Sequence, residues 1–114
     1  MRPVVVAAGL NGLMGVAMAA AGAHAFAGDA AAQGWVERAA QFQLLHALAM
    51  LAAERMPAAA LLFLAGIVGF SGSLYLKAFG LAGWLPGLVT PAGGVCLMLG
   101  WAALAAAGAF GRSR

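Results

Sequence analysis

Residues 3–28, PVVVAAGLNGLMGVAMAAAGAHAFAG, decide the class of fold. They form a run of 26 residues without a charged side chain, between Arg2 and Asp29. A helix needs about 20 apolar residues to cross a hydrocarbon core of about 30 Å. The hydrophobic region of a signal peptide is shorter, about 7–15 residues. We therefore interpret the run as a retained transmembrane helix.

The composition of the whole chain indicates the same class. Of the 114 residues, 65% are hydrophobic and 8% are charged, and the mean hydropathy is +0.98. A soluble domain of this size leaves too much surface exposed to hide so many apolar side chains. We expect one all-α integral membrane domain over residues 1–114. The net charge of +3 is spread along the chain, which argues against nucleic acid as a partner.

Charged residues divide the rest of the chain into further apolar runs. Arg55–Lys77 encloses 21 uncharged residues and Lys77–Arg112 encloses 34, but Arg38–Glu54 encloses only 15. Extending this short run to Trp35–Arg55 gives a helix of about 31 Å with charged side chains near both interfaces. The alternative is a helix that lies at the interface or packs against the others. The sequence thus predicts a bundle of four transmembrane helices with short loops, spanning about 3–27, 35–55, 57–79 and 86–110.

The charges between these spans predict an orientation. An even number of crossings places both ends of the chain on the same side of the membrane. That side carries four basic residues and the opposite side two, namely Arg2, Arg55, Arg112 and Arg114 against Arg38 and Lys77. The positive-inside rule then places the N- and C-termini in the cytoplasm.

Most polar side chains fall in one half of the predicted bundle. Because successive helices alternate in direction, their outer halves lie together, and Asn11 is the one polar residue placed in the other half. Polar groups in hydrocarbon need partners, and ionisable ones are candidates for functional sites. The candidate ligand-binding residues are His24, Gln41, Gln43, His46, Ser71, Ser73, Tyr75, Lys77 and Thr90.

Two interpretations of these nine residues stay open. In the first, they form hydrogen bonds that fix the register of the helices. In the second, they line a small polar cavity that includes the two histidines, His24 and His46. A helix that begins at Thr90-Pro91 would favour a lipid phosphate or a carboxylate there. In either case Gln43 and His46, about 60° apart on a helical wheel, are expected to face the interior.

We expect no catalytic residue, metal ligand or cofactor, and hence no enzyme. The two histidines have no Cys, Asp or Glu at ligand spacing, which argues against a metal site. Ser71-Gly72-Ser73 lies in an apolar span, and a nucleophile elbow would need a strand before it. No glycine-rich phosphate loop is present in the sequence.

Several segments together resemble a known family. They are Gly22-Ala23-His24-Ala25-Phe26, Gln41-Phe42-Gln43-Leu44-Leu45-His46-Ala47-Leu48-Ala49, Phe70-Ser71-Gly72-Ser73-Leu74-Tyr75-Leu76 and Thr90-Pro91-Ala92-Gly93-Gly94 followed by Leu99-Gly100-Trp101. In this order they are similar to the domain-of-unknown-function 423 family, the YgdD-like bacterial membrane proteins related to eukaryotic transmembrane protein 256. Phe42 stands where that family commonly has tyrosine. The resemblance implies a multi-pass protein of the bacterial plasma (inner) membrane and carries no settled activity.

Two functions fit these observations. The first is a non-enzymatic binding or accessory module whose polar half holds a membrane lipid or a small amphiphile. The alternative is a small transporter or channel that works as an oligomer, although the first span offers Asn11 and no acidic residue for proton coupling. Rows of small residues such as Gly15, Ala19 and Ala23 allow close helix contacts within the chain or between copies. The expected partners are therefore membrane lipid and a homo-oligomer or larger membrane complex.

Overall fold

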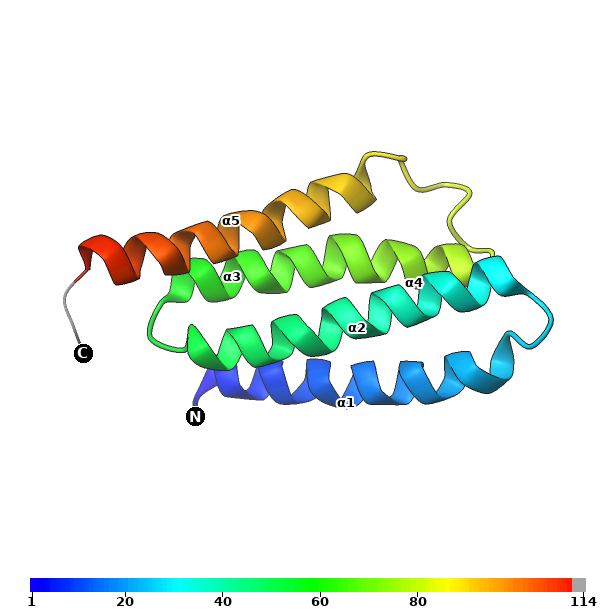
Figure 1. The fold of residues 1–114 in the computed structure, drawn as a ribbon, viewed down its shortest axis with the longest axis horizontal. Helices are drawn as coiled ribbons and strands as arrows, with labels where there is room; N and C mark the ends of the chain where they lie inside the picture. The colour runs from blue at the N-terminus through cyan, green and yellow to red at the C-terminus, as the bar shows by residue number, and fades with distance from the viewer. Residues whose placement is uncertain (112–114) are drawn as a thin grey trace.

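The computed structural model describes residues 1–111, and these fold into antiparallel helices (Figure 1). No strand is present in this part of the chain, which confirms the all-α class. Arg112 and Arg114, which entered the orientation prediction, lie outside the described residues. The elements are α1 (Pro3–Ala25), α2 (Ala30–Ala52), α3 (Pro57–Gly66), the π-helix η1 (Ile67–Ser71), α4 (Gly72–Ala78) and α5 (Val89–Phe110).

Three helices are long and apolar enough to cross a membrane. They are α1, the continuous α3–η1–α4 helix over Pro57–Ala78, and α5. Helix α2 has the same length as α1, 23 residues. Its polar side chains, among them Glu37, Arg38 and Gln41, lower its hydropathy. Length and composition therefore identify three of the four crossings that the sequence predicted.

The ends of the helices follow from local chemistry. Pro3 and Pro57 stand in the first turn of their helices, where a missing backbone N–H costs nothing. Asp29 caps α2, since its carboxylate accepts a hydrogen bond from the Ala32 backbone N–H at 3.1 Å. This cap begins α2 five residues before the start of the predicted span at residue 35. Gly28, with φ of +87°, makes the preceding turn, which favours glycine.

The start of α5 differs from the expectation. The sequence predicts a start at Pro86 or at Pro91, with Thr90 as the cap in the second case, whereas the helix begins at Val89 and Thr90 lies inside its first turn. The Thr90 hydroxyl lies 2.5 Å from Ser73 Oγ and links α5 to α4. The side chain therefore joins two helices rather than capping one.

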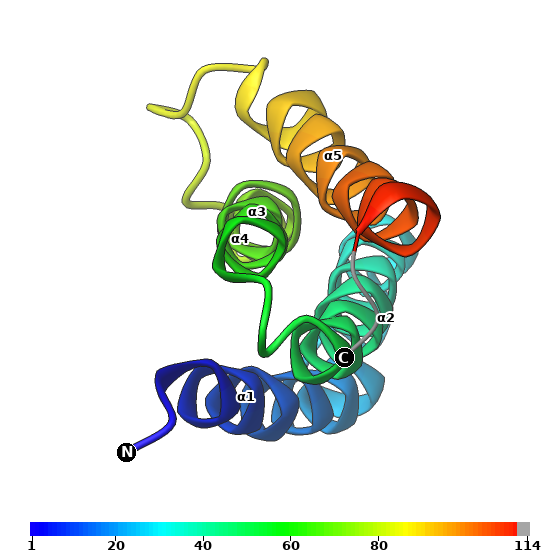
Figure 2. The same ribbon diagram turned by 90° about the vertical axis from the view of Figure 1, so that its left-hand side faces the viewer.

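The helices form a zigzag when viewed along the bundle (Figure 2). Helix α2 packs against α1 on one side and against the α3–η1–α4 helix on the other, and α5 packs against α3 and η1. We call the space between α1 and the α3–η1–α4 helix, floored by α2, the α1–α3 groove. The space between α2 and α5, floored by the α3–η1–α4 helix, is the α2–α5 groove.

Small residues set the distance between α5 and its neighbour. A Cβ atom on Gly93 would lie 2.6 Å from the backbone carbon of Gly69, and one on Gly66 would lie 2.9 Å from the backbone nitrogen of Leu97. Contacts this short are not tolerated, so these positions need glycine. Close backbone contact of this kind is how helices pack in lipid, where apolar burial drives little association.

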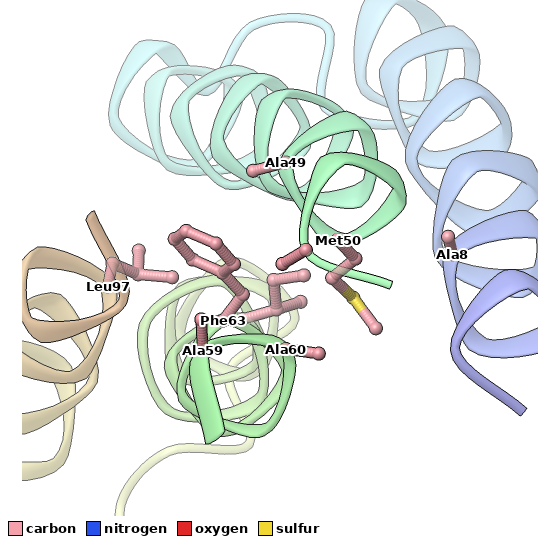
Figure 3. Close-up of a cluster of buried hydrophobic side chains, with 9 residues drawn as sticks. Ala8, Ala49, Met50, Ala59, Ala60, Phe63 and Leu97 are labelled. Carbon is pink, nitrogen blue, oxygen red and sulfur yellow. The ribbon is translucent and has the colours of Figure 1, made fainter. Parts of the chain in front are cut away.

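The apolar core joins all four antiparallel helices. Phe63 of α3 is fully buried and lies between Leu97 of α5 and Ala49 of α2 (Figure 3). Met50 of α2 continues the cluster toward Ala8 of α1. The large side chains of this cluster are thus surrounded by alanines, which let the backbones approach.

Candidate functional site

A chain of three side chains bridges the α1–α3 groove at mid-height. The Tyr75 hydroxyl of α4 donates to Gln43 Oε1 of α2 at 2.7 Å. Gln43 Nε2 then donates to Asn11 Oδ1 of α1 at 3.0 Å, and Asn11 Nδ2 donates to the Ala7 carbonyl at 2.9 Å. Gln43 is only 2% exposed. The bridge therefore satisfies a buried amide and ties three helices together.

Asn11 was missed as a member of this group. Its position in the predicted first span placed it in the opposite half of the membrane from the other polar residues. Helices α1 and α2 have equal lengths on either side of the Gly28 turn. Counting outward from that turn would have placed Asn11, near the middle of α1, beside the middle of α2.

Three hydroxyl side chains link the remaining helices. Ser71 Oγ is fully buried and donates to the Ala39 carbonyl of α2 at 2.8 Å. Ser73 Oγ donates to the Phe70 carbonyl at 2.9 Å. Since that bond uses the one hydroxyl proton of Ser73, Thr90 is the donor in the 2.5 Å contact between Thr90 Oγ1 and Ser73 Oγ.

His46 uses both of its ring nitrogens within the protein. Its Nε2 lies 2.9 Å from Trp101 Nε1, and its Nδ1 lies 2.7 Å from the Phe42 carbonyl oxygen. An indole N–H can only donate, so Nε2 accepts and Nδ1 carries the proton. This fixes a neutral imidazole in one tautomer. Trp101, which was not among the candidate residues, provides the partner from α5.

Aromatic rings fill the α2–α5 groove around this histidine. His46 lies against Phe42, Phe63 and Trp101, and Phe42 also lies against Phe70. Phe63 and Trp101 are in contact as well. The ring centroids in these pairs are 4.7–5.8 Å apart, a range typical of favourable aromatic contacts.

The other candidate residues lie apart from these groups. His24 is exposed in the last turn of α1, and Gln41 is exposed on α2. The Lys77 ammonium lies 5.4 Å from the centroid of the Trp35 ring, within reach of a cation–π contact. Within residues 1–111, every buried side-chain nitrogen and oxygen has a hydrogen-bond partner. Six of the nine residues therefore lie in small hydrogen-bonded groups, namely Gln43, His46, Ser71, Ser73, Tyr75 and Thr90.

Open space lies in the α1–α3 groove. A cleft of about 450 Å³ lies between the first half of α1 and α3. Its lining includes Pro3, Val4, Ala7, Met50, Glu54 and Ala60. A smaller cleft of about 190 Å³ lies beside the bridge and is bordered by Asn11, Gln43 and Tyr75. The bridge thus stands at mid-groove, with the larger cleft toward the end where α1 begins.

An ion pair marks that end of the groove. Arg2 donates to both carboxylate oxygens of Glu54, at 2.6 and 2.5 Å. The hydrogen bond from Arg2 is the main cause that lowers the pKa of Glu54, and the same bond raises the pKa of Arg2. Arg2 is 70% exposed, so solvent and salt screen the pair. Among residues 1–111, no three His, Cys, Asp or Glu side chains gather as a metal site would require.

Comparisons with known proteins identify relatives along most of the chain. The UPF0382 inner membrane protein YgdD of Escherichia coli K12 is 37% identical over 113 residues, which cover 89% of this chain and 85% of the relative. A UPF0382 membrane protein of Staphylococcus aureus is 35% identical, covering 89% and 90% of the two chains. One from Haemophilus influenzae is 36% identical, covering 84% and 85%. No solved structure shows significant similarity.

These relatives agree with the location expected from the sequence. They are named membrane proteins, and the Escherichia coli relative is named an inner membrane protein. The three apolar helices fit a multi-pass protein of that membrane. Residues 18–94 match the family described as "Protein of unknown function (DUF423)". The chain therefore belongs to this family of membrane proteins, as the resemblance of its motifs predicted.

Proposed function

We propose that the protein is a non-enzymatic membrane module that binds an acyl chain of a lipid or of a small amphiphile in the α1–α3 groove. The observation that supports this most is the cleft of about 450 Å³ between α1 and α3. Its volume lies within the range of about 300–1,000 Å³ that is usual for small-molecule sites. The polar half of the bundle, where the sequence suggested a ligand, has its buried groups paired already.

The lining of the cleft suits a molecule with one apolar and one polar end. Val4, Ala7, Met50 and Ala60 supply apolar walls. Arg2 and Glu54 stand where the cleft meets the end of the bundle. An acyl chain would lie along the walls with its headgroup near these charges. Of the nine candidate residues, Gln43 and Tyr75 belong to the bridge and would border the inner end of the acyl chain.

This function places α2 in the membrane as a fourth crossing. Helix α2 forms the floor of the α1–α3 groove and packs against α1 and the α3–η1–α4 helix. Its amide Gln43 and its imidazole His46 are buried and paired, which removes most of the cost of placing them in hydrocarbon. With both termini cytoplasmic, the larger cleft would face the cytoplasmic leaflet.

Native mass spectrometry tests the proposal directly. The protein would be released from nanodiscs of phosphatidylethanolamine and phosphatidylglycerol, as wild type, Val4→Trp and Val6→Trp. Val4 lines the cleft, so an indole there would fill it. Val6 is 47% exposed on the same helix and does not line that cleft, which makes Val6→Trp the matched control.

The outcomes are distinct. Bound lipid on the wild type and on Val6→Trp, with loss from Val4→Trp, supports the proposal. Lipid that stays on all three proteins equally, or no bound lipid on the wild type, contradicts it.

A further inference from the structure

We propose that two copies of the protein associate through the exposed face of α2, so that Glu37 of each copy meets Arg38 of the other. Gln41 would lie at the twofold axis between them. This inference goes beyond lipid binding and shares with it only the placement of α2 in the membrane.

The first support is an exposed amide at a depth where lipid offers it no partner. The contact of Lys77 with the Trp35 ring places these two side chains at one level, and such residues mark the membrane interface. Gln41 follows Trp35 by six residues, so it lies about 9 Å deeper along α2. Its side chain is exposed. Within residues 1–111, Gln41 takes part in no side-chain hydrogen bond.

The second support is the arrangement of charge around that amide. On a helical wheel, Gln41 lies about 40° from Glu37 on one side and about 60° from Arg38 on the other. All three side chains are exposed. Glu37 and Arg38 are adjacent in sequence, so they point apart and do not pair with one another on the same helix.

A twofold axis along the membrane normal makes this face complementary to itself. In such an interface residue i of one copy contacts residue j of the other, and j contacts i. We call the line of contact between the two α2 helices the seam. Glu37 and Arg38 flank it at similar depth, so Glu37 of one copy meets Arg38 of the other on each side of the axis. The two Gln41 side chains meet at the axis, where each amide can donate to the other. A mixed charge pair of this kind gives specificity for a second copy.

The apolar part of the same face continues the contact. Leu45 and Leu48 lie between Glu37 and Arg38 on the wheel and are 54% and 65% exposed. They would pack against their counterparts below the polar layer. The seam would therefore run along α2 from Glu37 toward its C-terminal end.

Cysteine cross-linking in native membranes tests the geometry. In a Cys96→Ala background, Gln41→Cys should form a disulfide-linked dimer upon mild oxidation. The matched control is Val68→Cys, because Val68 of η1 is 67% exposed but borders the α1–α3 groove instead of the proposed seam. A Gln41→Cys dimer at about ten times the yield of the control supports the proposal, and equal yields contradict it. Labelling of Gln41→Cys by a membrane-impermeant maleimide would place this face in water and overturn the proposal.

Charge exchange tests the pairing itself. In the Gln41→Cys background, Glu37→Arg or Arg38→Glu alone gives each copy two like charges at the seam, and the dimer yield should fall about tenfold or more. The double variant Glu37→Arg with Arg38→Glu restores self-complementarity and should restore the yield. Co-expression of the two single variants should give the mixed dimer. If the single variants cross-link as well as the parent, or if the double variant does not recover while remaining folded, the proposed pairing is wrong.

Discussion

The two grooves of the molecule are closed in different ways. In the α2–α5 groove, rings from three helices fill the space, and Trp101 closes it by donating to His46. In the α1–α3 groove, a hydrogen-bonded bridge of polar side chains runs from Tyr75 through Gln43 to Asn11. Clefts are left beside that bridge. Small residues bring helices together, but large side chains decide whether the resulting groove is filled.

The closest helix contact gives the largest expected effect. Gly93→Ala places a Cβ 2.6 Å from the Gly69 backbone, where no side chain can move aside. Separating α5 from η1 would open the α2–α5 groove and destabilise the protein by about 3 kcal/mol. Thermal unfolding in detergent micelles measures this effect.

The adjacent Gly94→Ala is the control for that measurement. Its Cβ would meet only the Phe70 ring, at 3.7 Å, which is an ordinary contact. Alanine is the better helix former by about 1 kcal/mol, so this variant should be as stable as wild type or slightly more stable. Equal losses from both variants would show that the close contact is not what holds α5.

The bridge of the α1–α3 groove gives the next effect. Gln43→Leu leaves the Tyr75 hydroxyl without its acceptor and Asn11 Oδ1 without its donor, which should cost about 2 kcal/mol of stability. Gln41→Leu on the same helix removes an exposed amide and should change monomer stability little. Comparing the unfolding of the two variants in detergent isolates the bridge. A similar loss from both would show that the bridge contributes nothing specific.

Particular residues show how much of the structure could be predicted from the sequence. The uncharged runs predicted helices that begin at Pro3 and Pro57, as observed, because apolar length and proline position act locally. The interior placement of Gln43 and His46 followed from the preference of polar groups for partners and is also observed. The level of Asn11 beside α2 could be counted from the Gly28 turn, but the pairings of Asn11 with Gln43 and of Trp101 with His46 depend on which helix faces pack together and in what register.

The cleft, too, could not be predicted from the sequence. Alanine and glycine in α1 predict close packing, and α1 does pack closely against α2. Its divergence from α3 results from the positions of all the helices together. The polar residues of the sequence indicate a site in the other half of the bundle, whereas the larger cleft lies at the opposite end of the groove.

A smaller effect is expected from the hydrogen bond between Trp101 and His46 in the α2–α5 groove. Trp101→Phe keeps most of the ring contacts but removes the hydrogen bond to His46 Nε2, at a cost of about 1 kcal/mol. Nitrogen-15 NMR of the imidazole reports the tautomer, and the wild type should show a proton on Nδ1 alone. Trp84→Phe, in the loop before α5 and largely exposed, is the control and should leave that spectrum unchanged. A wild-type spectrum with the proton on Nε2 would contradict the assigned bond.

The ion pair at the mouth of the open groove gives the smallest effect, because it is exposed and screened. The direction in which this stabilisation changes with pH follows from the lowered pKa of Glu54. The pair stabilises the folded protein above the unfolded carboxyl pKa of about 4.3, and this contribution is lost as the pH falls through the lower folded value. Glu54→Gln should therefore lower the melting temperature slightly at pH 7, and the difference from wild type should vanish in acid. Glu37→Gln, at the opposite end of α2, is the control in monomeric detergent preparations. A difference for Glu54→Gln that grows as the pH falls would mean that Arg2 stabilises the neutral carboxyl instead, and the charged end proposed for the cleft would lose its support.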